Sequence, residues 1–161
     1  PGPPGRIRQP RPIWLEAPLS RFKRPESVLV LVCTARNEVL MLERVEPPGF
    51  WQSVTGSLRW GESAAQAAQR ELYEETGLRG GSLLSNLRQG ERFPIVPPWK
   101  QRYAPHARIN TEHWFILRLP TRRGVRLNQA EQRRYRWVSA RQAARMAYSS
   151  SNRNAIRRFC Q

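Results

Sequence analysis

The chain contains no aspartate, so any carboxylate that takes part in chemistry must be a glutamate. Acidic residues are few altogether: 12 glutamates stand against 28 lysines and arginines in 161 residues, for a formal net charge of +16. Long apolar runs are also missing, and none approaches the roughly 20 residues of a membrane-spanning helix. The first residues lack the basic-then-apolar pattern of a signal peptide. We therefore expect no membrane association.

Cysteine is equally scarce. Cys33 lies within an apolar stretch and is expected to be a small buried hydrophobe, whereas Cys160 is next to last and is expected to be mobile. Neither belongs to a CxxC pair, so the sequence does not suggest a disulfide framework. This cysteine usage favours a reducing, cytoplasmic location.

The positive charge is unevenly distributed. Residues 23–78 carry six basic and eight acidic residues, a net of −2, whereas residues 79–161 carry eighteen basic and three acidic residues, a net of +15. A basic half beside a small acidic cluster suits a polyanionic substrate, whose phosphates would be steered inward. The alternative is that the surface arginines reflect only compositional bias and solubility.

One stretch is far more specific than the composition. Residues 56–78 follow the pattern G-x5-E-x7-R-E-U-x-E-E-x-G-U, where U is aliphatic, without a departure. From Ser63 the stretch is rich in helix formers and free of Pro and Gly, so it predicts a helix. Gly77 stands where a left-handed C-terminal cap is expected. Ala65, Ala68 and Leu72 recur at helical spacing and predict a thin face that packs against a sheet.

Three glutamates of this helix are expected to converge. Glu71 and Glu75 are one turn apart and Glu74 is three residues from Glu71, so their charges repel unless a cation lies between them. A hard divalent cation that prefers oxygen ligands, Mg²⁺ or Mn²⁺, would turn that repulsion into a binding site. The alternative is a solvated acidic face. Glu62 and Arg70 are expected to hold the loop and helix in shape.

The rest of the chain reads as one enzyme domain with an N-terminal tail. Residues 1–22 are rich in Pro and Arg without periodicity and are expected to be flexible, whereas residues 23–161 form the domain. Strands are expected at 27–35 and 39–42, joined as a hairpin by a turn at 36–38, and at 112–119 and 135–138, with further short strands after Gly80-Gly81. A proline-rich loop is expected around 94–98, and helices are expected at 140–146 and 151–159. Strands mixed with helices indicate an α/β fold with a mixed sheet.

The 56–78 pattern is the Nudix box, and the whole of residues 23–159 resembles one Nudix subfamily, the bacterial dihydroneopterin triphosphate pyrophosphatases. The motifs that carry this resemblance are Lys23-Arg24-Pro25, Val39–Arg44, Phe50–Ser57, Arg102–Pro105, Asn110–Phe115, Tyr135-Arg136-Trp137, and Ser151–Arg153 with Ala155-Ile156. The resemblance implies a Nudix-type α/β/α sandwich. It also implies metal-dependent hydrolysis of dihydroneopterin triphosphate in folate biosynthesis.

The resemblance also implies roles for individual residues. The metal ligands would be Glu71, Glu75 and Glu131. The substrate contacts would be Lys23, Arg44, Thr55, Phe93, Pro94, Ile95, Val96 and Ser149. Lys23 and Arg44 suit a triphosphate, and Phe93 offers an apolar face to a flat pterin, although Pro94 removes a backbone donor. Glu131 could instead be an ordinary surface glutamate.

The expected reaction is metal-assisted hydrolysis with Glu74 as a candidate general base. Its substrate is a small-molecule triphosphate, and nucleic acid is not an expected partner. Three alternatives stay open: a Nudix hydrolase of nucleoside triphosphates or RNA 5′ ends, a basic nucleic-acid-binding module on an inactive scaffold, and an interaction protein acting through its tail. The interleaved aromatic and basic residues of single-strand-binding surfaces are not found, and three mutually repelling glutamates have no use in an inactive scaffold.

Overall fold

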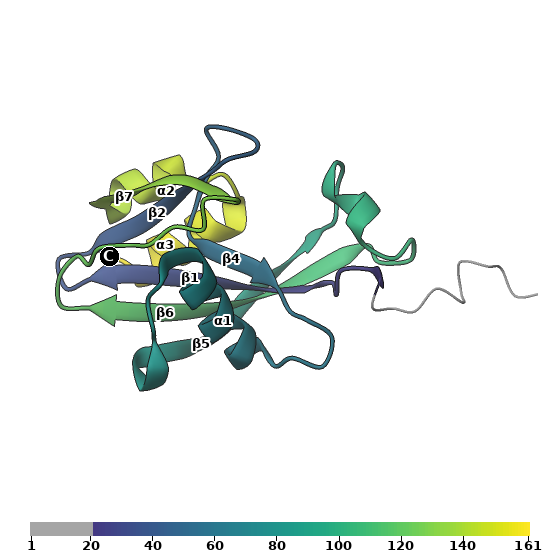
Figure 1. The fold of residues 1–161 in the computed structure, drawn as a ribbon, viewed down its shortest axis with the longest axis horizontal. Helices are drawn as coiled ribbons and strands as arrows, with labels where there is room; N and C mark the ends of the chain where they lie inside the picture. Colours follow the sequence, from purple (N-terminus) through teal and green to yellow (C-terminus); the bar gives the residue numbers. More distant parts are fainter. Residues whose placement is uncertain (1–20) are drawn as a thin grey trace, which may run out of the picture.

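A computed structural model describes residues 21–161 of the chain, and the predicted flexible tail lies almost wholly outside them. Figure 1 shows a twisted sheet with helices packed on it. The strands are β1 (Glu26–Thr34), β2 (Glu38–Arg44), β3 (Trp51–Gln52), β4 (Val54–Ser57), β5 (Leu84–Pro94), β6 (Ile109–Leu119) and β7 (Gln132–Ser139). The helices are α1 (Ala64–Thr76), α2 (Ala140–Met146) and α3 (Ser150–Phe159), with 3-10 turns η3 (Gly81–Leu83) and η4 (Trp99–Arg102).

The sheet is mixed. Its main order is β3-β2-β1-β6-β5, with β4 paired to β1 and β7 paired to β2. The central pair, β1 with β6, is parallel, and the pairs of β2 with β1, β3 and β7 are antiparallel, as is β5 with β6. Asn37 has a φ of 55° in the turn between β1 and β2, which accounts for the predicted hairpin.

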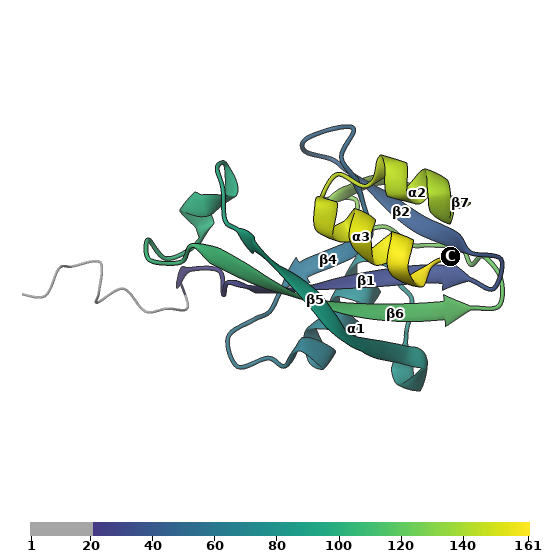
Figure 2. The ribbon, with the colours of Figure 1, turned by 180° about the vertical axis from the view of Figure 1, so that it is seen from behind.

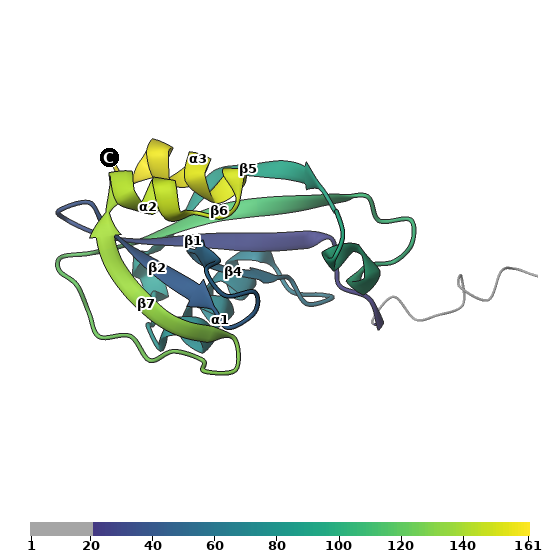
Figure 3. The same ribbon diagram turned by 90° about the horizontal axis from the view of Figure 1, so that it is seen from above.

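Helices cover both faces of the sheet, as Figures 2 and 3 show for α3 and α1. Successive residues of β1 alternate between two buried clusters. Leu29 and Leu31 pack with Trp114 under α2 and α3, whereas Val28 and Val30 pack under α1. We call these the α3 face and the α1 face. This arrangement confirms the expected α/β sandwich with a mixed sheet.

Some local expectations were wrong in detail. The segment after the box forms one 11-residue strand, β5, rather than several short ones, and Pro94 ends this strand instead of lying in a loop. Strands β6 and β7 are both longer than predicted. On α1, Ala67, Ala68 and Leu72 are buried whereas Ala65 is exposed. The buried stripe of α1 is therefore rotated from the predicted one, since Ala67 and not Ala65 faces the sheet.

The expectation about cysteine was wrong. Cys33 of β1 and Cys160, which follows α3, form a disulfide with a Cα–Cα distance of 6.5 Å, and both residues are fully buried. The residue predicted to be mobile is thus held in the core. The pairing joins positions 127 residues apart, and only the packing of α3 on β1 brings them together.

Among the helices of residues 21–161, none combines the length and apolar character needed to span a bilayer.

Candidate functional site

The box begins with a loop that one arginine fastens to α1. Arg70 donates from Nε and Nη2 to the two carboxylate oxygens of Glu62, both at 2.8 Å, and from Nη2 to the carbonyl of Ser57 at 3.1 Å. The helix itself starts at the N-cap Ser63, which forms a reciprocal capping box with Gln66, and ends at Gly77 with a φ of 73°. Glu62 and Arg70 therefore shape the site, as the sequence predicted.

Glu71 needs the glycine of β4 opposite it. A side chain at Gly56 would overlap the Glu71 carboxylate, so glycine leaves the space that this group fills. Arg70 donates to Glu71 Oε1 at 2.6 Å. Burial raises the pKa of Glu71, and the charges of Glu74 and Glu131 raise it further, whereas the contact with Arg70 lowers it.

Glu75 is the most buried of the box glutamates, with 2% of its surface exposed. The backbone N–H of Thr55 donates to its Oε2 at 3.4 Å, and among the described residues no Lys or Arg pairs with it. Burial raises its pKa well above the usual range, and the nearby charges of Glu71 and Glu131 add to this effect. A buried carboxylate in this position fits a cation, which would lower the cost of its charge.

Glu74 points differently from its two neighbours. It is exposed and binds Arg70 at 3.2 Å and Arg59 at 3.4 Å. The three box glutamates therefore do not converge on one point as the spacing predicted. Glu71 and Glu75 point toward the sheet, whereas Glu74 lies at the rim.

Glu131 comes from the other end of the chain and lies in the turn before β7. Its backbone carbonyl accepts a hydrogen bond from Val45 N at 2.9 Å, which ties this turn to the segment after β2. Its charge acts on Glu71, Glu75 and Lys23. Residues 21–161 contain no cluster of three or more His, Cys or Glu side chains close enough to hold a metal ion. The contact of Arg70 with Glu71 and the mutual repulsion of the carboxylates both oppose a closer approach.

Two cations lie near these carboxylates. The pKa of Lys23 is lowered, first by partial removal from water and then by the charges of Arg102 and Arg44, whereas Glu71 and Glu131 raise it. Arg44 ends β2 and donates to the carbonyl of Glu46 at 2.9 Å. A site that binds both phosphates and a metal ion needs cations beside carboxylates. The presence of Lys23 and Arg44 near the glutamates fits such a site.

The other predicted substrate residues are more dispersed. The Thr55 hydroxyl donates to the Val28 carbonyl at 2.9 Å, and Ser149 caps α3 by accepting from Asn152 N at 3.1 Å. In the 93–96 stretch, Phe93 is half-buried, Pro94 and Val96 are exposed, and Ile95 is buried. The backbone N–H of Ile95 already donates to the Arg108 carbonyl at 2.8 Å. Thr55 and Ser149 thus have local structural bonds, and the half-buried Phe93 stays a predicted substrate contact.

The sequence did not single out two buried polar residues of β6. Glu112 and Asn110 are 6% and 3% exposed and lie on the α3 face near Phe93. The sequence contained an indication of these residues, because Asn110 and Glu112 occupy alternate positions just before the apolar run of β6.

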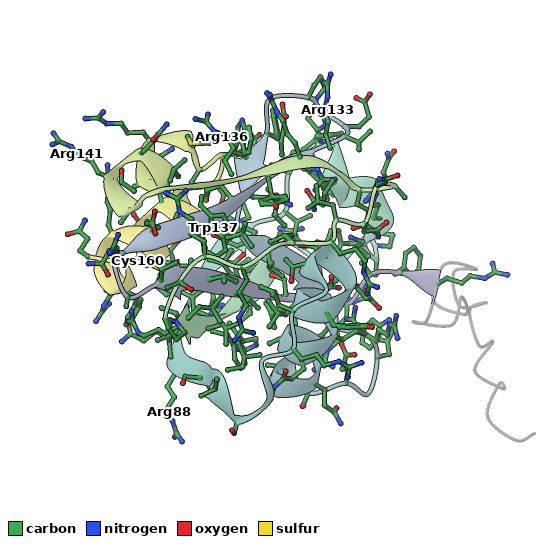
Figure 4. All side chains as sticks on the ribbon, turned by 60° about the vertical axis from the view of Figure 1, so that its left-hand side comes forward. Arg88, Arg133, Arg136, Trp137, Arg141 and Cys160 are labelled. Carbon is green, nitrogen blue, oxygen red and sulfur yellow. A yellow bond between two sulfur atoms is a disulfide. The ribbon has the colours of Figure 1, made fainter. Side chains whose placement is uncertain are left out.

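The arginines of the basic half lie mainly on the outside. Figure 4 shows Arg88, Arg133 and Arg141 projecting from the body of the molecule, and all three are exposed. Arg134 and Arg136, on β7, lie over the ring of Trp51 with guanidinium carbons 5.3 and 6.0 Å from its centroid. These arginines therefore lie on the surface of the molecule, two of them over an aromatic ring.

Comparisons with known proteins agree with this site. A model of the NUDIX domain matches residues 23–159. The chain is 42% identical over 142 residues to dihydroneopterin triphosphate diphosphatase of Escherichia coli, an alignment that covers 86% of this chain and 93% of that protein. It is 35% identical over 145 residues to the Haemophilus influenzae protein of the same name, covering 88% and 90%.

A solved structure agrees as well. The structure of the E. coli dihydroneopterin triphosphate pyrophosphohydrolase superimposes with a TM-score of 0.80 at 41% identity, and the match covers 86% of this chain and 97% of that one. Together with the intact box and the sandwich fold, these similarities show that the chain belongs to the NUDIX domain family of hydrolases.

Proposed function

We propose that this chain hydrolyses dihydroneopterin triphosphate to dihydroneopterin monophosphate and pyrophosphate, with Mg²⁺, or Mn²⁺ in its place, as cofactor. The observation that carries the proposal is 42% identity, over 86% of the chain, to a protein named for that substrate. The site supports it, since buried Glu75 lacks a cationic partner among the described residues while Lys23 and Arg44 lie beside the cluster.

Each of the predicted site residues has a role in the proposed reaction. Glu71, Glu75 and Glu131 would hold the metal, which when bound neutralises phosphate oxygens and lowers the pKa of a coordinated water. Lys23 and Arg44 bind the triphosphate and orient it. The Thr55 N–H fixes Glu75 in place. Glu74 lies at the rim and is the candidate general base for the attacking water.

A substrate panel tests the proposal. Purified protein with Mg²⁺ should release pyrophosphate from dihydroneopterin triphosphate faster than from GTP, ATP or a triphosphorylated RNA 5′ end. The Glu75→Gln variant keeps the shape of the side chain and should lose turnover. Glu38→Gln is the matched control and should keep its turnover, because Glu38 lies at the end of β2 opposite to Arg44. Preference for RNA or for a nucleoside triphosphate would overturn the substrate assignment.

The predicted cytoplasmic location belongs to the same proposal. The predicted location is a reducing compartment, which seldom retains a bond such as the Cys33–Cys160 disulfide. Alkylation of thiols in rapidly acid-quenched cells measures which form exists. A fully alkylated protein agrees with a reducing location, and a fully protected one contradicts it.

A further inference from the structure

A row of polar side chains crosses the α3 face at one end of the sheet. Ser27 of β1 pairs with Glu112 of β6, which pairs in turn with Glu91 of β5. Paired residues of neighbouring strands point to the same face. Two positions further along, Leu29 and Trp114 belong to the core under α3, so this row lies on that face as well.

Glu112 has one oxygen that no group satisfies. The Trp114 indole N–H donates to Oε1 at 3.0 Å, and the Ser151 hydroxyl of α3 donates to the same atom. Among residues 21–161 nothing donates to Oε2, and neither Lys nor Arg pairs with Glu112 or Glu91. In a chain with 28 basic residues this is an unusual omission. Two carboxylates directly opposite each other are also unfavourable.

Asn110 provides an independent observation. It is 3% exposed, and its Nδ2 donates to Ser27 Oγ at 2.7 Å, whereas its Oδ1 is buried without a partner. It precedes Glu112 by two residues on β6, so both side chains lie on the same face. Buried acceptors are normally paired, and one that is not calls for a ligand or a water.

An aromatic ring borders these acceptors. Phe93 of β5 pairs directly with Asn110 and therefore lies on the same face, half-buried. Two unpaired acceptor oxygens beside an aromatic ring fit a flat heterocycle whose edge carries N–H donors. A 2-amino-4-oxo pteridine has such an edge, formed by the 2-amino group and the N3–H.

We infer that Glu112 and Asn110 determine specificity for the pterin ring: Glu112 Oε2 and Asn110 Oδ1 accept hydrogen bonds from its 2-amino group and N3–H. This assignment rests on the proposed function and names the residues that select its substrate. A purine lacking the amino group, or a ring with an oxygen in its place, would leave one acceptor unpaired or facing another oxygen, which is the strongest form of discrimination available to a polar site.

The spacing of the strands sets the reach that a ligand needs. Ser57 of β4, Ser27 of β1 and Glu112 of β6 form one row on the α3 face, and strands are about 4.8 Å apart, so Glu112 lies roughly 10 Å from Ser57. Gly56 and Glu71 lie next to Ser57 but on the α1 face, so the triphosphate would have to pass from one face of the sheet to the other near β4. The three-carbon side chain of dihydroneopterin and its bicyclic ring can cover that span. Ser151, which touches Glu112, is only two residues beyond Ser149 on α3.

The first test is Glu112→Gln. The new amide oxygen can still accept from Trp114 and Ser151, while its NH₂ group faces the pterin donors in place of an acceptor. We expect kcat/KM for dihydroneopterin triphosphate to fall by at least about tenfold, mainly through KM, as for loss of a hydrogen bond to a charged group. Glu26→Gln removes a carboxylate from the neighbouring position on the α1 face and should leave both constants nearly unchanged.

The second test varies the ring instead of the protein. 6,7-Dimethylpterin and 6,7-dimethyllumazine differ only by an amino group or an oxygen at position 2. The wild-type enzyme should be inhibited competitively by the pterin at least about tenfold more strongly, and Glu112→Gln should reduce that preference. Equal inhibition by both rings, or none by either, overturns the inference even if the variant fails to fold. Absence of pyrophosphate release by the wild type would instead overturn the proposed function.

Discussion

At the scale of single residues, several carboxylates of the proposed sites have no lysine or arginine partner. Most glutamates of residues 21–161 are bound by arginine, as Glu62 is by Arg70 and Glu43 by Arg134. Glu46, Glu75, Glu91, Glu112 and Glu131 are not. For three of these we propose other partners: a metal for Glu75 and Glu131, and a ligand ring for Glu112.

Glu131 is the most exposed of the proposed metal ligands, and one substitution tests its role. If it binds the metal, Glu131→Ala should lower turnover by at least about tenfold and raise the Mg²⁺ concentration for half-activity. An exposed carboxylate among arginines would contribute at most about 1 kcal/mol and would not affect turnover. Activity measured across a Mg²⁺ titration separates the two roles, with Glu38→Gln as control. An unchanged titration curve would return Glu131 to the surface.

Glu112 should also affect the pH dependence of stability. Burial raises its pKa above the usual value, in spite of the Ser151 and Trp114 hydrogen bonds, and the charge of Glu91 raises it further while His113 lowers it. The Glu112 carboxylate therefore binds a proton more tightly in the folded protein than in the unfolded chain, where a glutamate has a pKa of about 4.3. Stability from this group is present below that pH and is lost as pH rises through the folded pKa.

The corresponding measurement is urea unfolding of wild type and Glu112→Gln at a series of pH values. Relative to the variant, the wild type should be most stable in acid and should lose that advantage as the pH increases toward neutrality. A stability difference that stays constant across the series would show that the Glu112 pKa is the same in both states.

At the scale of elements, the close approach of α1 to β4 sets the positions of Glu71 and Glu75, two of the proposed metal ligands. Gly56 has no side chain, and the Glu71 carboxylate lies in the space that one would fill. Ala67 and Ala68 let the helix lie close to the sheet, and Leu72 anchors its middle. The spacing of the box is therefore a packing requirement as much as a chemical one.

Gly56→Ala should separate packing from catalysis. The added methyl group overlaps only the end of a flexible glutamate, so the fold should survive with a stability loss of at most about 1–2 kcal/mol. Turnover should fall at least about tenfold, because Glu71 must move from its position. Gly124→Ala is the control, since its methyl group would meet no atom within 4 Å. Full activity in Gly56→Ala would show that Glu71 does not need this space.

At the scale of the whole molecule, a disulfide joins the first strand to the end of the last helix. Cys33 and Cys160 are 127 positions apart, and both are buried between β1 and α3. This bond holds α3 on the face where Ser149 and Ser151 lie. Helix α3, whose N-cap Ser149 is one of the proposed substrate contacts, is therefore held to β1 at its other end by Cys160.

Loss of this bond should be measurable. Cys160→Ser should lower the free energy of unfolding by about 2–4 kcal/mol under oxidising conditions, because the unfolded chain is no longer constrained by the crosslink. Dithiothreitol should destabilise the wild type and leave the variant unaffected. Thermal melts of both proteins with and without reductant provide the comparison, and a wild-type melt insensitive to reductant would contradict the prediction.

The sequence by itself determined what depends on near neighbours. The cap at Ser63, the left-handed Gly77, the Arg70–Glu62 pair and the helix that carries Glu71 and Glu75 follow from residues within two or three turns of one another. The β1–β2 hairpin follows from a short turn between two apolar runs. Family resemblance then supplied candidates, such as Glu131, that spacing alone could not identify.

Only the tertiary structure decided which distant residues meet. The pairing of Cys33 with Cys160 and the unpaired oxygens of Glu112 and Asn110 depend on how β6 and α3 pack with β1. The rotation of α1 that buries Ala67 instead of Ala65 depends on how this helix packs on β1 and β4. No local pattern encodes these contacts, because burial and partner choice are properties of surfaces assembled from several segments, and each segment is compatible with many partners until the core has formed.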